Sequence, residues 1–122
     1  MTVGSLLTLV SGGSYAQREA VIAASIELLR ADQATAVILE GLPDGTQRLS
    51  ELPRLQLHRI APGCMCCIGN LAMRVTLNRI LRHPPAQLFL GLSSADHVEK
   101  IIQFLQQDDY KTLLLMDQDI RI

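Results

Sequence analysis

Three thiols lie within one short, glycine-flanked segment of the chain. Cys64, Cys66 and Cys67 belong to the sequence GCMCCIGN, residues 63–70, and account for all 3 cysteines. Zinc and copper(I) prefer thiolate ligands, and a turn lets neighbouring sulfurs converge, whereas a strand points them to alternating faces. The glycines permit such a turn. The segment therefore predicts a soft-metal site, with inert, buried cysteines as the alternative.

The same segment is also compatible with thiol redox chemistry. It precedes a predicted helix, whose positive N-terminal dipole favours the thiolate form that both metal binding and redox reactions need. Cys64 and Cys67 have the bare C-x-x-C spacing, although Cys66 interrupts the arrangement typical of thioredoxin-like folds. A redox function therefore stays open beside metal binding.

A second candidate lies in the turn after the first predicted strand, where α/β nucleotide-binding proteins carry a phosphate loop. The working motif G-x-x-x-x-G-K-[S/T] supplies a lysine to the terminal phosphates and a hydroxyl to magnesium. Here Gly12 keeps the first glycine, but Gln17, Arg18 and Glu19 stand at the second glycine, the lysine and the hydroxyl residue. Glu19 would place negative charge where nucleotide oxygens approach. We therefore interpret the segment as a plain strand-to-helix turn and expect no nucleotide binding; a degenerate phosphate loop with weak contacts from Gly12 and Arg18 is the alternative.

Histidines and acidic residues near these segments are weaker candidates. His58 ends a predicted strand shortly before the thiols and is the nearest additional metal ligand, whereas His83 ends a helix and His97 lies in the first turn of another. For each histidine a surface or packing role is the alternative. Glu40 and Asp44 follow the second predicted strand and are interpreted as solvated turn residues.

A regular α/β framework is predicted to position these residues. Short apolar runs bounded by turn residues alternate with stretches of helical period, which is typical of a parallel sheet covered by helices. We predict a three-layer α/β domain whose sheet has about five mainly parallel strands. The predicted strands span residues 5–10, 35–40, 55–60, 87–92 and 112–116.

Three segments have helical period. Residues 16–30 form a predicted helix that is well buried because it carries two apolar rows, Val21, Ala24 and Leu28 in one and Ile22, Ile26 and Leu29 in the other. A second helix begins near the cap candidate Asn70 and ends at His83, with one apolar face (Met73, Leu77, Ile80, Leu81) and one basic face (Arg74, Arg79, Arg82). A third opens with capping-box spacing at Ser93 and Asp96 and buries Val98, Ile101, Ile102 and Leu105.

Composition limits the possible functions. The chain has 122 residues, matching one domain over residues 1–122, and a hydrophobic fraction of 48% with 19% charged residues is typical of a globular protein. A net charge of -1 and 3% aromatic residues give no basic or stacking surface for nucleic acid. The absence of a signal pattern and of a membrane-length apolar run, together with an odd number of cysteines, predicts reduced thiols and a cytoplasmic location.

The order of these features resembles the CobW-like metallochaperone GTPases, which are SIMIBI-class P-loop proteins. The resemblance is carried by Leu6 to Ile22, by the G-C-x-C-C motif within Pro62 to Asn70, and by the strand and small-residue turn of residues 85–95. Gly91 stands where the family has a glutamate. The resemblance implies a P-loop-type domain with a degenerate phosphate loop, and intracellular handling of a transition metal such as zinc at Cys64, Cys66 and Cys67.

The leading hypothesis is therefore a soft-metal binding protein, for zinc or alternatively copper, without a functional nucleotide site or GTPase activity. A GTP-binding metallochaperone with an atypical loop and a thiol redox or interaction module are the alternatives. Expected partners are a metal-receiving client protein and a second copy of the chain, because the apolar run 113–116 lacks the cover it would have in the family. Neither nucleic acid nor a membrane is expected as a partner.

Overall fold

Strands and helices alternate along most of the described chain. A computed structural model describes residues 4–29, 34–41, 55–60, 69–93, 98–107, 110 and 112–122. Its elements are β1 (Ser5–Ser11), α1 (Tyr15–Glu27), β2 (Thr35–Glu40), β3 (Leu55–Ile60), α2 (Gly69–Ile80), β4 (Gln87–Leu92), α3 (Val98–Leu105) and β5 (Leu114–Arg121). The strands form one sheet in the order β3-β2-β4-β1-β5, and every neighbouring pair is parallel. The predicted α/β class and parallel sheet are confirmed.

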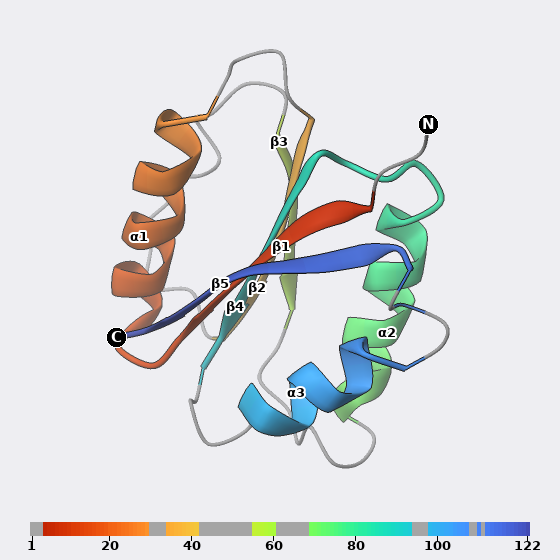
Figure 1. Ribbon diagram of the computed structural model, residues 1–122. Helices are drawn as coiled ribbons and strands as arrows, with labels where there is room; N and C mark the ends of the chain where they lie inside the picture. The colour runs from red at the N-terminus through yellow and green to blue at the C-terminus, as the bar shows by residue number, and fades with distance from the viewer. Residues whose placement is uncertain are drawn as a thin grey trace.

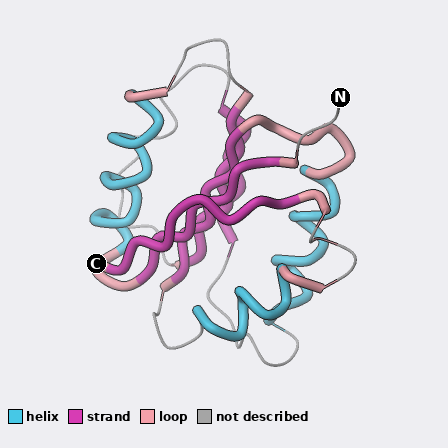
Figure 2. The backbone as a smooth tube through the Cα atoms, viewed as in Figure 1, coloured by secondary structure: helices cyan, strands magenta, loops and turns pink. Residues whose placement is uncertain are grey.

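Helices cover both faces of this sheet (Figure 1). From β1 to β2 the chain moves toward one edge of the sheet, whereas from β3 to β4 and from β4 to β5 it moves toward the other. Because crossovers between parallel strands are right-handed, opposite directions place the helices on opposite faces. Accordingly, of the described helices, α1 lies on one side of the strands, and α2 and α3 lie on the other (Figure 2). The result is the predicted three-layer arrangement.

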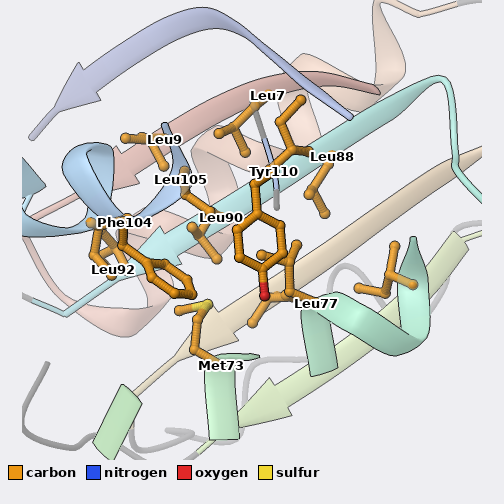
Figure 3. Packing of buried hydrophobic residues seen from close by; sticks show 14 of the residues in the cluster. Leu7, Leu9, Met73, Leu77, Leu88, Leu90, Leu92, Phe104, Leu105 and Tyr110 are labelled. Carbon is orange, nitrogen blue, oxygen red and sulfur yellow. The ribbon is translucent and has the colours of Figure 1, made fainter. Parts of the chain in front are cut away.

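Two apolar clusters fill the spaces between the layers. The larger one joins the sheet to α2 and α3 and contains Leu7, Leu9, Met73, Leu77 and Phe104 among its buried residues (Figure 3). The smaller one joins the other sheet face to α1, with Val10, Ile22, Val37, Leu39 and Phe89. Alternation along each strand supplies both clusters, since successive side chains point to opposite faces.

Several boundaries and burial expectations need correction. The helix α1 buries Ile22, with Ile26 and Leu29 packed beside it, but only Val21 of the other predicted row packs against the same cluster. Ala24 is exposed and Leu28, beyond the helix end, is 88% exposed. The last strand spans Leu114–Arg121 instead of 112–116, because pairing with β1 continues through its polar residues. Asn70 is the second residue of α2, not its cap.

Edge position explains why β5 is longer than its apolar run. Strands β3 and β5 each have one neighbour, and most of β5 is exposed. A strand with water on its outer side tolerates Asp117, Gln118 and Asp119, which the interior of a parallel sheet would not. None of the described helices has both the length and the hydropathy that crossing a bilayer requires.

Candidate functional site

All five strands point the same way, so their carboxyl ends share one edge of the sheet. At this edge α1 leaves β1 toward one face, while the chain after adjacent β4 leads to α3 on the other. In open α/β sheets, ligands bind where neighbouring connections diverge in this way. The carboxyl edge between β1 and β4 is therefore the candidate site, and Gly12, Gly41 and Ser93 follow directly on three of its strands.

Arg18 closes the turn that occupies the phosphate-loop position. Its Nη1 donates to the carbonyl oxygens of Gly12 at 2.9 Å and Gly13 at 2.8 Å, and its Nη2 donates to the carbonyl oxygen of Glu40 at 3.3 Å. The residue is 3% exposed, so the guanidinium lies beneath the turn and faces the protein. Burial lowers the pKa of Arg18 below its ordinary value, while the nearby Glu40 and Tyr15 oppose that shift.

The start of α1 is capped by its own side chains. Ser14 Oγ accepts from Gln17 N at 3.1 Å, and Gln17 Oε1 accepts from Ser14 N at 2.8 Å, which completes a capping box. Gln17 thus has a structural role at the position of the second motif glycine. These two backbone donors, of the kind that hold phosphate oxygens in a phosphate loop, are satisfied within the chain.

Glu19 faces away from this turn. Its carboxylate is 0% exposed and accepts from both terminal nitrogens of Arg59 on β3, at 3.0 and 3.2 Å. Arg59 also donates to the hydroxyl of Tyr15 and lies 5.6 Å from the centre of its ring. The hydrogen bond to Glu19 raises the pKa of Arg59, with burial opposing. The expectation that Glu19 holds negative charge at the mouth of the turn is therefore wrong; its charge is neutralised beside β3.

Glu40 is buried, not solvated as the sequence suggested. It is 4% exposed, and its Oε1 accepts from Ser93 N at 3.0 Å and from Ser93 Oγ at 2.7 Å. The hydroxyl of Ser93, expected to cap the third helix, is therefore used to connect the ends of β4 and β2. Glu40 thus links two segments at this edge: its backbone carbonyl accepts from Arg18 on α1, and its carboxylate accepts from Ser93 after β4.

Gly41 lets β2 pass close to this cluster. Its φ of +143° is a conformation that side-chain-bearing residues rarely adopt. A Cβ atom here would lie 2.7 Å from Tyr15 Cδ2 and 2.8 Å from Arg18 Nη2. Tight packing against a glycine thus fixes Tyr15 and Arg18 where the strand ends.

The structure brings together some of the predicted site residues and leaves others outside the described part. Gly12 and Arg18 contact each other, whereas Cys64, Cys66 and Cys67, together with Asp44 and His97, lie outside the described residues. The segment that holds the thiols connects Ile60, the last residue of β3, with Gly69, the first of α2. Within the described residues no group of three or more histidine, cysteine, aspartate or glutamate side chains gathers around one point.

His58 lies on β3, half-buried, with its Nε2 3.0 Å from Gln56 Nε2. Burial, followed by the positive charge of Arg79 on α2, lowers the pKa of His58 below its ordinary value of 6.5. The imidazole is consequently neutral near pH 7, the form that can accept a metal ion. His83 is exposed in the turn after α2.

We expect an NMR titration to give His58 a pKa below its ordinary value of 6.5. In the Arg79→Gln variant the pKa of His58 should rise only part of the way back toward 6.5, because burial, the larger cause of the shift, remains. Since the unfolded chain binds this proton more readily, stability is unaffected by His58 above the unfolded-state pKa and falls as the pH drops below it. Removing the imidazole in His58→Gln should flatten this part of the stability profile. An unshifted His58 in the wild-type protein would contradict the assignment.

Comparison of the chain with known protein families, with curated proteins and with solved structures found no match. Inference about function therefore rests on the residues themselves. What the described geometry can do chemically is limited, because most polar groups at the carboxyl edge already have partners within the chain: Arg18, Glu40 and Ser93 are joined by hydrogen bonds, and Glu19 and Arg59 form an ion pair. The Ser11 hydroxyl and Arg18 Nε are buried there without a hydrogen-bond partner among the described residues.

Proposed function

We propose that the chain binds one soft metal ion, zinc or copper(I), through Cys64, Cys66 and Cys67, and that it does so without a nucleotide. The carrying observation is the concentration of three thiols in the connection between β3 and α2, which leaves the sheet at the edge where α/β proteins place their ligands. The donor set fits these metals by its chemistry, because thiolates are their preferred protein ligands.

The contacts of Arg18 support the proposal that the chain does not bind a nucleotide. A phosphate loop needs a cation that faces the ligand and a hydroxyl that reaches magnesium. Here the guanidinium is directed to three carbonyl oxygens of its own chain, and Glu19 is held by Arg59. A nucleotide and its magnesium therefore do not fit the side chains at this turn, and GTP hydrolysis is not part of the proposed function.

Three thiolates leave a tetrahedral ion one ligand short. The fourth position could be taken by water, by His58, by a thiol of a second copy or by a client protein. An exchangeable ligand suits transfer of the metal better than a closed structural site, so we propose a metal-receiving client as the partner. A reducing compartment such as the cytoplasm would keep the thiols in the binding form.

The test is a zinc titration of the reduced protein against a chromophoric chelator, with Cys64→Ser, Cys66→Ser and Cys67→Ser beside the wild type. We expect about one zinc ion per chain and a loss of affinity of at least about tenfold in two or three of the variants. Affinity should fall as the pH drops, because each thiol must lose a proton to bind the metal.

Met65→Leu is the matched control for zinc, since it changes the same segment and keeps every thiol. Equal and negligible binding by the wild type and all three cysteine variants would contradict the proposal. A disulfide between Cys64 and Cys67 that forms and breaks reversibly in protein that binds no metal would favour the redox alternative. In parallel, calorimetry with GTP and magnesium should give no heat of binding. Micromolar affinity for GTP would contradict the proposal that the chain works without a nucleotide.

We further propose that the chain self-associates through β5. This edge strand exposes 44% of both Leu115 and Met116, and parallel strands are normally covered on both faces. Light scattering should show a dimer that forms as the protein concentration rises. Met116→Lys should weaken this dimer, whereas Gln118→Lys, a control on the same strand, should change it less. A strictly monomeric mass over a wide concentration range would exclude this assembly.

A further inference from the structure

A cavity of about 400 Å³ opens between α2 and the chain that runs from the end of α3 into β5. Its volume lies within the range of small-molecule sites. It lies away from the carboxyl edge, because α2 runs toward the opposite edge and β5 starts there. The polar and aromatic residues that line it are Arg74, Asn78, Arg82, Phe104, Gln107 and Tyr110.

The α2 wall of the cavity is a row of hydrogen-bond donors. Arg74 and Asn78 are four residues apart and so lie on one side of α2, and Arg82 follows at the same interval just beyond the end of the helix. The hydroxyl of Tyr110 donates to Asn78 Oδ1 at 2.7 Å, and this bond turns the NH₂ group of the amide away from Tyr110. Among the described lining residues none is acidic. The wall therefore has the charge and the donors that an anion requires.

The opposite wall is aromatic. Phe104 and Tyr110 are 7% and 4% exposed, and their ring centres are 5.1 Å apart. Figure 3 shows both rings on the α2 side of the sheet, near Met73 and Leu77. The guanidinium of Arg74 lies 5.3 Å from the centre of the Phe104 ring, so a cation–π contact holds one donor beside the apolar wall.

Helix stability alone does not account for this arrangement. Arg82 follows the end of α2 at Ile80, where a positive charge is favourable next to the helix dipole. Arg74 lies well before that end and gains nothing from it. Neither arginine forms an ion pair with a carboxylate of the described residues. Asp108 and Asp109 lie outside the described residues.

We propose that this cavity binds a small organic anion, namely a carboxylate or phosphate group attached to an aromatic or short aliphatic body. Its oxygens would accept from Arg74, Asn78 and Arg82, and its apolar part would lie against Phe104 and Tyr110. The site is independent of the thiols, so it holds or fails whatever the metal titration shows.

Two-dimensional ¹H–¹⁵N NMR of the full chain can test the site with benzoate and phenyl phosphate as probes. We expect both to shift the amide signals of residues 74–82, 104–107 and 113, and to bind at least about tenfold more tightly than benzamide, a neutral isostere of benzoate. Phenyl phosphate should also bind more tightly than inorganic phosphate. If inorganic phosphate binds as tightly as phenyl phosphate, the apolar wall does not contribute to binding and the proposed organic ligand is wrong. If neither benzoate nor phenyl phosphate produces saturable shifts, the whole proposal is overturned.

Three variants assign the binding to these side chains. Asn78→Asp keeps an acceptor for the Tyr110 hydroxyl while placing a negative charge in the donor row, and the paired change Arg74→Gln with Arg82→Gln removes both cations. Each should weaken probe binding at least about tenfold. Arg79→Gln is the control, because Arg79 is exposed on the same helix and does not line the cavity. Equal losses in the control and the double variant would overturn the assignment.

Discussion

We expect Arg18→Met to lower the free energy of unfolding by about 3 kcal/mol or more, since hydrogen bonds to charged groups contribute roughly 1.5–3 kcal/mol each and three are lost together. Methionine fills much of the same space but donates nothing to the carbonyls of Gly12, Gly13 and Glu40. It also leaves the buried Glu40 without its nearby cation. Urea denaturation followed by circular dichroism measures the loss.

Two further variants show whether the effect belongs to this contact. Arg79→Met changes an exposed arginine and should stay within about 0.5 kcal/mol of the wild type. Arg18→Lys should lie between the wild type and Arg18→Met, because a single ammonium cannot reproduce the planar fork that reaches three carbonyls. If Arg18→Met unfolds at the same urea concentration as the wild type, the turn does not depend on the guanidinium.

The same contacts explain why restoring the motif residues would not rebuild a phosphate loop. Glu19→Thr would supply the missing hydroxyl but would remove the buried partner of Arg59. Arg18→Lys would restore the lysine but would release the carbonyls that shape the turn. The turn is a stabilising connection between β1, β2 and β3, and the contacts of Arg18 and Glu19 serve that connection.

The sheet could be predicted from the sequence because its central strands are buried on both faces. Runs 35–40 and 87–92 are apolar between their polar end residues and buried at every position, and the structure forms strands over the same residues. The outer strand β5 lacks this signal after Met116, so its length could not be predicted from its own residues. Pairing with β1 sets that length.

The polar contacts at the carboxyl edge could not be predicted, because each joins residues far apart in the chain. Arg18 and Glu40 are 22 positions apart, Glu19 and Arg59 are 40 apart, and Glu40 and Ser93 are 53 apart. One signal was present: Arg18 and Glu19 lie on the side of α1 that carries Ile22, a fully buried residue. Charged residues on a buried helix face need partners from another element.

Gly91→Glu should lower the free energy of unfolding by about 4 kcal/mol or more, because it combines overpacking with an unpaired buried charge. Gly91 pairs with Val10 and Leu39 in the neighbouring strands. A Cβ atom at this position would lie 2.5 Å from Leu39 Cδ1 and 3.4 Å from Ile22 Cδ1. The carboxylate would thus enter the apolar cluster beneath α1, and denaturant unfolding measures the cost.

Two substitutions at the same position separate size from charge. Gly91→Ala should cost only about 1–2 kcal/mol, because the nearest atom is the movable end of the Leu39 side chain. Gly91→Gln has the size of glutamate without its charge. Burial would raise the pKa of the introduced carboxyl above its unfolded value of about 4.3, so the difference between the Glu and Gln variants should nearly vanish near pH 4 and grow as the pH rises. A pH-independent difference would mean that the introduced carboxylate reaches solvent and does not enter the apolar cluster.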